Sequence, residues 1–250
     1  MIALSNDIQA IRTQQPLVHN ITNFVVMNTT ANALLALGAS PIMAHAVDEL
    51  PDLLGIASAL VINIGTLDKT WIASFENAML FAIKRHLPVV IDPVGAGASQ
   101  FRTNTTLHLL KLAKVTAIRG NASEIIALAQ QRVNARGVDS ADNSDDAIQS
   151  AKNLSKQFHS IVVVSGKTDH CVLNDKVISV EGGSKLMTRI TGMGCTASAI
   201  MGAFLAVNNN PLEACVNAMT CMKKCGEYAE KNSVGPGSFW TVFLDKLYSI

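Results

Sequence analysis

Short apolar runs alternate with segments of helical periodicity along almost the whole chain. In the clearest unit, Asp68 can cap a helix, and apolar residues then recur on one helical face from Trp71 to Ile83. The apolar run 89–91 follows this helix and predicts a buried strand. Repeated alternation of this kind predicts an α/β fold with three layers, in which helices cover both faces of a mainly parallel central sheet.

Further apolar runs fit the same sheet, and each ends in a polar or glycine-containing turn. They span residues 59–64, 115–118 and 161–164. Between residues 171 and 180, two short apolar runs flank Asn174 and Asp175, which predicts a hairpin and therefore an antiparallel edge beside the parallel strands. Because no linker interrupts the pattern, we expect residues 1–250 to form a single domain.

The charge of the chain is nearly balanced, since 20 Lys and Arg residues face 19 Asp and Glu residues without a long block of either sign. This balance argues against nucleic acid and acidic membrane surfaces as partners. Only 16% of the residues are charged and 49% are hydrophobic, so we expect another subunit to cover part of the surface. The five cysteines are scattered and no secretory signal is visible, so we expect a cytoplasmic protein with reduced thiols.

The segment from 190 to 212 carries no charged residue and resembles a membrane span in this respect alone. It is rich in Gly, Ser, Thr and Asn and contains Pro211, which a membrane span would disfavour. We therefore expect a buried helix that follows a glycine loop.

Ligands of open parallel sheets collect beyond the carboxyl ends of the strands, so the residues that follow each apolar run are candidates for chemistry. Asp92 follows the run 89–91 and is itself followed by a glycine-containing turn, 93–98, whose amides can approach a phosphate. An aspartate that shapes the turn before Pro93 explains the same pattern equally well.

A second candidate is the segment 119–124, directly after the run that ends at Ile118. Asn121 and Glu124 have the spacing of a capping box, which needs no ligand. The position at the ligand end of the sheet nevertheless suits a phosphate contact for Arg119 and a Mg²⁺ contact for Glu124.

The third candidate is the segment 191–195, immediately before the apolar helix. Gly192 and Gly194 permit a backbone that points successive N–H groups at an anion, and the helix dipole adds to the attraction. At a helix amino end we expect the pKa of the Cys195 thiol to fall below about 8.5, which would let Cys195 act as a base. A small buried cysteine that packs behind the loop explains the pattern equally well.

Two weaker signals complete the set, and no Walker A spacing accompanies them. Ser165 follows the run 161–164 and either contacts a nucleotide or belongs to a polar turn before the hairpin. Near the amino end, His19, Asn20 and Asn23 are too polar for an ordinary apolar strand, although a solvated turn would explain some of them. Met43 has the soft thioether that suits a heteroaromatic ring, but a core position is the commoner role.

Taken together, these segments resemble the hydroxyethylthiazole kinase family of the ribokinase-like superfamily. The matching motifs are 16–23 (PLVHNITN), 38–43 (GASPIM), 92–97 (DPVGAG), 119–124 (RGNASE), 191–195 (TGMGC) and 235–239 (GPGSF). Their order and spacing cover nearly the whole chain. The alternatives are a kinase of the same fold for another alcohol, such as hydroxymethylpyrimidine, a lyase that repairs hydrated NAD(P)H, and a non-catalytic thiazole-binding protein. The amino-terminal motif argues against the other kinase.

The resemblance implies a ribokinase-like fold and a homotrimer that phosphorylates 4-methyl-5-(2-hydroxyethyl)thiazole with ATP and Mg²⁺ in thiamine biosynthesis. By resemblance, the thiazole would contact Asn23, Met43 and Gly192, ATP would contact Arg119, Ser165, Asp92 and Asn121, and Asp92 and Glu124 would organise Mg²⁺. Cys195, with Gly192 and Gly194 beside it, occupies the place of the superfamily's aspartate base. Met193 and Ser165 replace two threonines that we expect in the family, and Ser165 keeps the hydroxyl.

Overall fold

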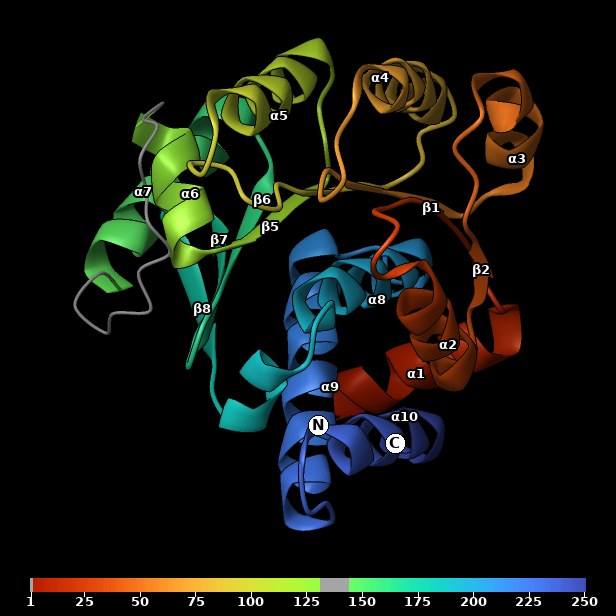
Figure 1. The fold of residues 1–250 in the computed structure, drawn as a ribbon, viewed down its shortest axis with the longest axis vertical. Helices are drawn as coiled ribbons and strands as arrows, with labels where there is room; N and C mark the ends of the chain where they lie inside the picture. Colours follow the sequence, from red (N-terminus) through yellow and green to blue (C-terminus); the bar gives the residue numbers. More distant parts are fainter. Residues whose placement is uncertain (1, 131–143) are drawn as a thin grey trace.

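The computed structural model describes residues 2–130 and 144–250. Within these residues, an eight-stranded sheet has the strand order β2-β1-β3-β4-β5-β6-β7-β8 (Figure 1). The strands are β1 (Leu17–Ile21), β2 (Ser40–Ile42), β3 (Ala59–Asn63), β4 (Val89–Asp92), β5 (Ala117–Asn121), β6 (Ile161–Ser165), β7 (Asp169–Leu173) and β8 (Lys176–Val180). Neighbours from β2 to β6 are parallel, and β7 and β8 pair antiparallel at one edge. The predicted mainly parallel sheet with an antiparallel hairpin is confirmed.

Helices cover both faces of this sheet, as Figure 1 shows. One face carries α1 (Ile2–Gln14), α2 (Met27–Leu37), α8 (Met193–Val207), α9 (Pro211–Lys231) and α10 (Pro236–Ser249). The other face carries α3 (Leu50–Ile56), α4 (Lys69–Lys84), α5 (Gln100–Leu112), α6 (Ala122–Gln130) and α7 (Ser144–Phe158). Two short 3₁₀ helices, η1 (Val47–Glu49) and η3 (Lys185–Arg189), lie in connections.

Alternate residues of the strands face the two helical layers, because successive side chains of a strand point to opposite faces. In β3, Val61 packs in the core beneath α8, whereas Leu60 and Ile62 pack in the core beneath α3 to α7. All five residues of β3 are buried, as expected for a parallel strand covered on both faces. The sheet is therefore the middle of three layers.

The cap predicted for α4 is present. The Asp68 carboxylate accepts the N–H of Trp71 at 2.8 Å, and α4 begins at Lys69. Trp71, Phe75 and Met79 of this helix are buried against the sheet. Local capping and apolar periodicity thus predict the start of α4 and the face that it buries.

Strand β5 differs from its prediction, since it runs from Ala117 to Asn121 and not over 115–118. Its polar end pairs with β6, with Arg119 opposite Val163 and Asn121 opposite Ser165. A prediction that follows apolar runs stops at the first polar residue, whereas the hydrogen-bond ladder depends on the backbone and continues. The site segment therefore begins inside the sheet.

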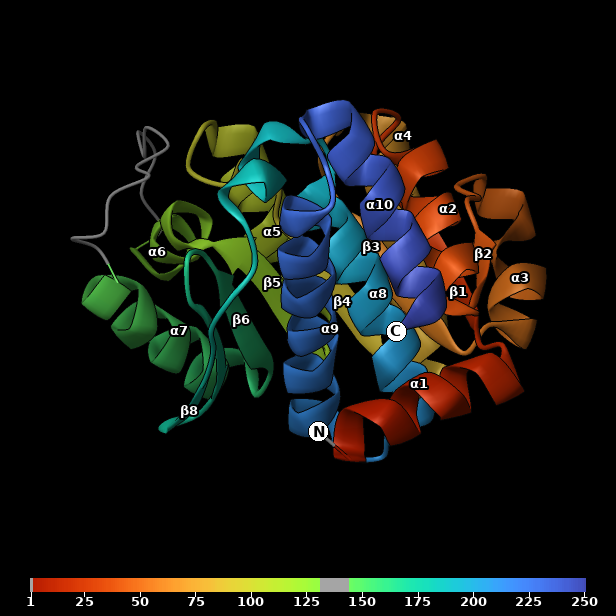
Figure 2. The ribbon, with the colours of Figure 1, turned by 90° about the horizontal axis from the view of Figure 1, so that it is seen from below.

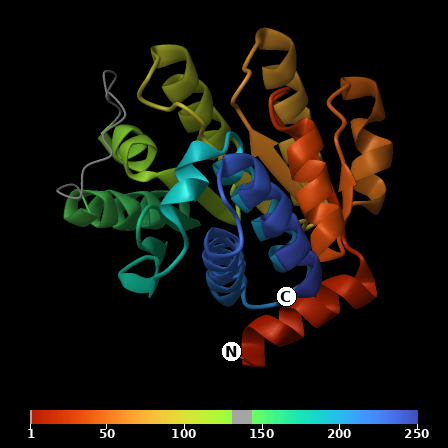
Figure 3. The ribbon, with the colours of Figure 1, turned by 60° about the horizontal axis from the view of Figure 1, so that its bottom comes forward.

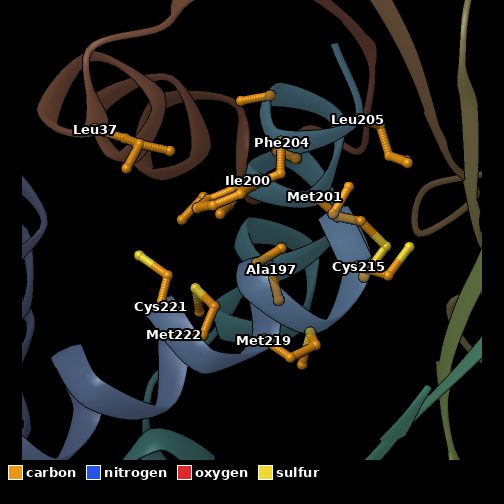
Figure 4. Close-up of a cluster of buried hydrophobic side chains, with 14 of the residues drawn as sticks. Leu37, Ala197, Ile200, Met201, Phe204, Leu205, Cys215, Met219, Cys221 and Met222 are labelled. Atoms are coloured by element: carbon orange, nitrogen blue, oxygen red, sulfur yellow. The ribbon is translucent and has the colours of Figure 1, made fainter. Parts of the chain in front are cut away.

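Helix α8 lies in the hydrophobic core on one face of the sheet. Figures 2 and 3 show α9 and α10 outside it, and Figure 4 shows α8 side chains packing among the sulfur atoms of α9. Ala197, Ile200 and Phe204 are at most 3% exposed, and Cys215 and Cys221 of α9 are fully buried. The buried helix predicted after the glycine loop is confirmed, and no described helix is long and apolar enough to span a membrane.

Candidate functional site

The carboxyl ends of four neighbouring parallel strands bring polar side chains together. They are Asn63 of β3, Asp92 of β4, Arg119 of β5 and Ser165 of β6. Oδ2 of Asp92 accepts hydrogen bonds from Nδ2 of Asn63 at 3.1 Å and from Oγ of Ser198 in α8 at 2.7 Å. Burial raises the pKa of the Asp92 carboxyl, and the charge of Arg119 opposes this shift. Asp92 is therefore a buried carboxyl held in place by three neighbours.

Arg119 connects this carboxyl to the next strand. Its Nη1 lies 3.9 Å from Oδ2 of Asp92, and its Nη2 donates to Oγ of Ser165 at 2.6 Å. Its Nε is buried and has no acceptor among the described residues, so this donor of the guanidinium is unsatisfied. Gly194 lies directly against the same group, because a Cβ at Gly194 would come within 2.6 Å of Nη1.

Glu124 joins the turn 93–98 to the end of β5 through hydrogen bonds. Its Oε1 accepts the N–H of Gly95 at 2.9 Å, and its Oε2 accepts the N–H of Asn121 at 2.8 Å. Oδ1 of Asn121 accepts the N–H of Glu124 at 2.9 Å, so the predicted capping box is confirmed. Burial raises the pKa of the Glu124 carboxyl, and the negative charge of Asp92 raises it further.

Asp92 lies close enough to Glu124 for its charge to act on the pKa of the Glu124 carboxyl, and both side chains are buried. The described part of the chain holds no cluster of three His, Cys, Asp or Glu residues suited to a metal. Mg²⁺ commonly binds through one or two carboxylates and takes its other ligands from phosphates and water. The two carboxylates therefore fit a Mg²⁺ that arrives with a nucleotide.

The two glycine turns at this edge of the sheet differ. In the turn 93–98, the N–H groups of Gly95 and Gly97 are bound by Glu124 and by Oγ1 of Thr103, both at 2.9 Å. At the start of α8, the N–H groups of Gly194 and Cys195 have no acceptor among the described residues. The glycine amide of the second turn and the Cys195 amide beside it are therefore free donors for an anion, and they lie at the positive end of the helix dipole.

Cys195 contacts the amino-terminal segment of the chain. Nδ2 of Asn23 lies 3.5 Å from its Sγ, and Nδ2 of Asn23 also donates to Oδ1 of Asn63 at 2.7 Å. The expected fall in the Cys195 pKa is wrong, because burial and the charge of Asp92 raise it to about 11. The helix end does not compensate for this loss of water and this nearby negative charge.

The amino-terminal polar residues are buried in or directly after a strand, so a solvated turn does not explain them. His19 and Asn20 lie in β1 and are at most 1% exposed, and Asn23 follows the strand at 4%. Nε2 of His19 forms a hydrogen bond with the carbonyl oxygen of Ala44 at 2.9 Å. Half-buried Met43 follows β2 at the same carboxyl edge.

Two residues of this region were not singled out from the sequence. Asn63 stands inside the apolar run 59–64, and its only signal was a single amide near the end of that run. Arg102 of α5 donates hydrogen bonds to the carbonyl oxygens of Ile64 at 3.2 Å, Gly65 at 2.7 Å and Val94 at 2.6 Å. No local pattern predicts Arg102, because its acceptors lie in loops after β3 and β4.

Comparison with known proteins places this geometry in a family. The model of the hydroxyethylthiazole kinase family matches residues 8–250. The chain belongs to the hydroxyethylthiazole kinase family. A hydroxyethylthiazole kinase of Nitratidesulfovibrio vulgaris is 51% identical over 244 residues, which cover 98% of this chain and 91% of that protein. The chain is therefore an enzyme, a phosphotransferase of this family.

Solved structures agree with this assignment. The hydroxyethylthiazole kinase structure from Pyrococcus horikoshii has a TM-score of 0.92 and 42% identity and covers 100% of this chain and 94% of its own. A ribokinase-like superfamily protein from Enterococcus faecalis has a TM-score of 0.65 at 16% identity, covering 93% of this chain and 86% of its own. The second likeness concerns the fold alone, and the ribokinase-like fold expected from the sequence is confirmed.

Proposed function

We propose that this member of the hydroxyethylthiazole kinase family transfers the γ-phosphoryl group of ATP to the hydroxyl of 4-methyl-5-(2-hydroxyethyl)thiazole, a step of thiamine biosynthesis. One observation carries the proposal. The N–H groups of Gly194 and Cys195 have no acceptor among the described residues and lie beside Arg119 and buried Asp92. Such a set of preorganised donors suits the charge that develops on a transferred phosphoryl group.

The candidate residues divide between the two substrates. Asn23, Met43 and Gly192 would contact the thiazole, while Arg119, Ser165, Asp92 and Asn121 would contact ATP. The hydrogen bond from Arg119 to Ser165 supports the nucleotide side, since it aligns a guanidinium and a hydroxyl on adjacent strands. The contact between Asn23 and Cys195 supports an acceptor site at the start of α8.

Mg²⁺ would be held by Asp92 and Glu124 and would offset negative charge on the phosphates. Glu124 already accepts two backbone N–H groups, so it also fixes the turn that follows Asp92. Arg119 would orient phosphate oxygens, and Gly192 and Gly194 would keep the backbone close to the transferred group. Transfer then depends mainly on alignment and charge stabilisation.

We propose that Cys195 acts as the general base. Its thiolate form would accept the proton of the attacking hydroxyl as the phosphoryl group is transferred. Because the pKa of the thiol is about 11, only a small fraction is thiolate at neutral pH. A loose transition state requires little deprotonation early in transfer, so a scarce base limits the rate without abolishing it.

We also propose a cytoplasmic homotrimer with sites at subunit boundaries. Phe24 and Val25, directly after Asn23, are 60% and 63% exposed. Adjacent exposed apolar side chains beside a candidate site support a subunit contact there. Size-exclusion chromatography with light scattering measures the assembly, and a monomer would contradict it.

A phosphotransfer assay tests the proposal. The purified protein is incubated with MgATP and the thiazole alcohol, and the product is identified by mass, with hydroxymethylpyrimidine as the competing acceptor. We expect thiazole phosphate to form in preference to the pyrimidine phosphate. Folded protein that binds ATP but makes no thiazole phosphate would refute the proposed substrate.

A further inference from the structure

Lys223 is a buried cation outside the site described above. It lies in α9, and its side chain is 8% exposed. Nζ donates to the carbonyl oxygens of Gly166 at 2.8 Å and Lys167 at 2.9 Å, and it lies 3.3 Å from Oδ1 of Asp169. All three acceptors belong to the turn 166–169, which begins directly after Ser165.

Asp169, the last residue of the same turn, closes the turn with a hydrogen bond. Its Oδ1 accepts the N–H of Gly166 at 2.9 Å, and the residue is 2% exposed. Lys223 and Asp169 thus form a buried ion pair in which the remaining hydrogen bonds go to one short turn. Such a pair fixes geometry well, because removal of one partner leaves the other charge buried and unpaired.

This ion pair continues the charge pattern of the site. The positive charges of both Lys223 and Arg119 act on the Asp169 carboxyl. Along the carboxyl edge of the sheet, Asp92, Arg119, Asp169 and Lys223 therefore alternate in sign. A shift of the turn 166–169 would act on Arg119 in two ways, through the charge of Asp169 and through the hydrogen bond between Arg119 and Ser165.

The aliphatic stem of Lys223 is covered by a second segment. Gly183 has a φ of 83°, and a Cβ there would lie 2.8 Å from Cδ of Lys223. This glycine precedes η3, which leads along the chain to Gly192. Lys223 therefore contacts one segment that follows Ser165 and packs under another that leads to the anion turn.

We propose that Lys223 is a positioning residue for the nucleotide, which holds the turn 166–169 so that Ser165 and the adjoining backbone meet ATP. The inference rests on the proposed role of Ser165 and Arg119 in ATP binding. Lys223 itself acts through the turn and does not touch a substrate.

Steady-state kinetics of Lys223→Met test this role. We expect the KM for ATP to rise about tenfold, while kcat and the KM for the thiazole change less than about threefold, since binding of ATP is weakened equally in the ground state and in the transition state. Lys224→Met is the matched control, because this neighbour on α9 lines a surface groove with Leu4 and Ile8. An unchanged KM for ATP, or equal rises for both substrates, would overturn the inference.

Two further measurements keep the test independent of folding and of turnover. Lys223→Met/Asp169→Asn removes both charges and should still raise the KM for ATP, so it decides the matter if the single variant does not fold. Trypsin cleavage after exposed Lys167, followed by peptide mass, should be faster in the variants than in the parent protein. Equal cleavage rates would contradict a fixed turn.

The outcomes also separate this inference from the proposed function. If the parent enzyme phosphorylates the thiazole and Lys223→Met binds ATP normally, the inference alone is wrong. If the parent forms no thiazole phosphate, the proposed function is wrong, and calorimetric titration with a non-hydrolysable ATP analogue still measures the effect of Lys223→Met on nucleotide binding.

Discussion

The two glycine turns at the carboxyl edge of the sheet each contain two glycines, but they differ in whether their backbone N–H groups are already hydrogen-bonded. In the turn 93–98, side chains of α5 and α6 accept the N–H groups of Gly97 and Gly95. In the turn 191–195, the N–H groups of Gly194 and Cys195 have no acceptor in the described residues. The first turn is a scaffold that presents Asp92, and the second is the donor set that we propose for an anion.

This difference shows that glycine content alone does not identify an anion site. Glycine lets a backbone adopt the required dihedral angles, but neighbouring elements decide whether its amides are already bound. Here Glu124 and Thr103 accept the glycine amides of one turn, and no side chain of the described residues accepts those of Gly194 and Cys195. The predictions below separate the scaffold from the donor set.

The largest effect is expected for Asp92→Asn, which removes the charge that the first turn presents. The amide can keep some hydrogen bonds but loses the charge opposite Arg119, so kcat should fall about 1,000-fold. A coupled assay at saturating ATP measures this, with circular dichroism to verify folding. The exposed Asp52→Asn is the control and should retain full activity. Activity within threefold of the parent would remove Asp92 from the site.

Gly194→Ala tests the donor set by placing a methyl group beside it. A Cβ there would lie 2.6 Å from Nη1 of Arg119, so the guanidinium, whose Nη2 donates to Ser165, must shift. We expect kcat/KM to fall about 100-fold with little change in the melting temperature. Gly237→Ala is the matched control, since a Cβ there meets nothing within 4 Å. Equal activity of the two variants would mean that the close approach to Arg119 has no catalytic role.

Cys195 should reveal itself in the pH dependence of turnover. Below its pKa of about 11, the thiolate fraction grows tenfold with each pH unit, so log kcat of the parent should rise with pH above neutrality. Cys195→Ala should lose this rise and about tenfold in kcat at pH 8, whereas Cys195→Asp should be active with a flat profile. Parallel profiles for parent and Cys195→Ala are the result that excludes a base role.

The smallest effect is expected for Thr103→Val, which leaves the buried N–H of Gly97 without its acceptor. The free energy of unfolding should fall by about 1–3 kcal/mol, because a buried donor loses its partner, while activity changes little. Thr106→Val is matched to it, since the Thr106 hydroxyl bonds only a carbonyl of its own helix. Chemical denaturation of both variants gives the difference, and equal stabilities would contradict the scaffold role of this turn.

Most of the architecture could be read from local patterns. The Asp68 cap, the Asn121–Glu124 capping box and the hairpin at Asn174 all involve residues within a few positions of each other. The apolar runs also located most strands. The run at 115–118 found β5 but gave the wrong bounds, because backbone pairing extends the strand through polar residues to Asn121. Predictions of this kind are confirmed where the stabilising interactions join residues that are close in the sequence.

The amino-acid sequence by itself determined the α/β alternation, the caps and the polar strand ends, because side-chain periodicity and capping act over a few residues. Only the tertiary structure decided three features of the site region. Asn63 accepts a hydrogen bond from Asn23, which also contacts Cys195. Lys223 donates to the turn after Ser165, and the pKa of Cys195 rises. Those outcomes depend on contacts between distant segments and on exclusion of water, which no local pattern encodes.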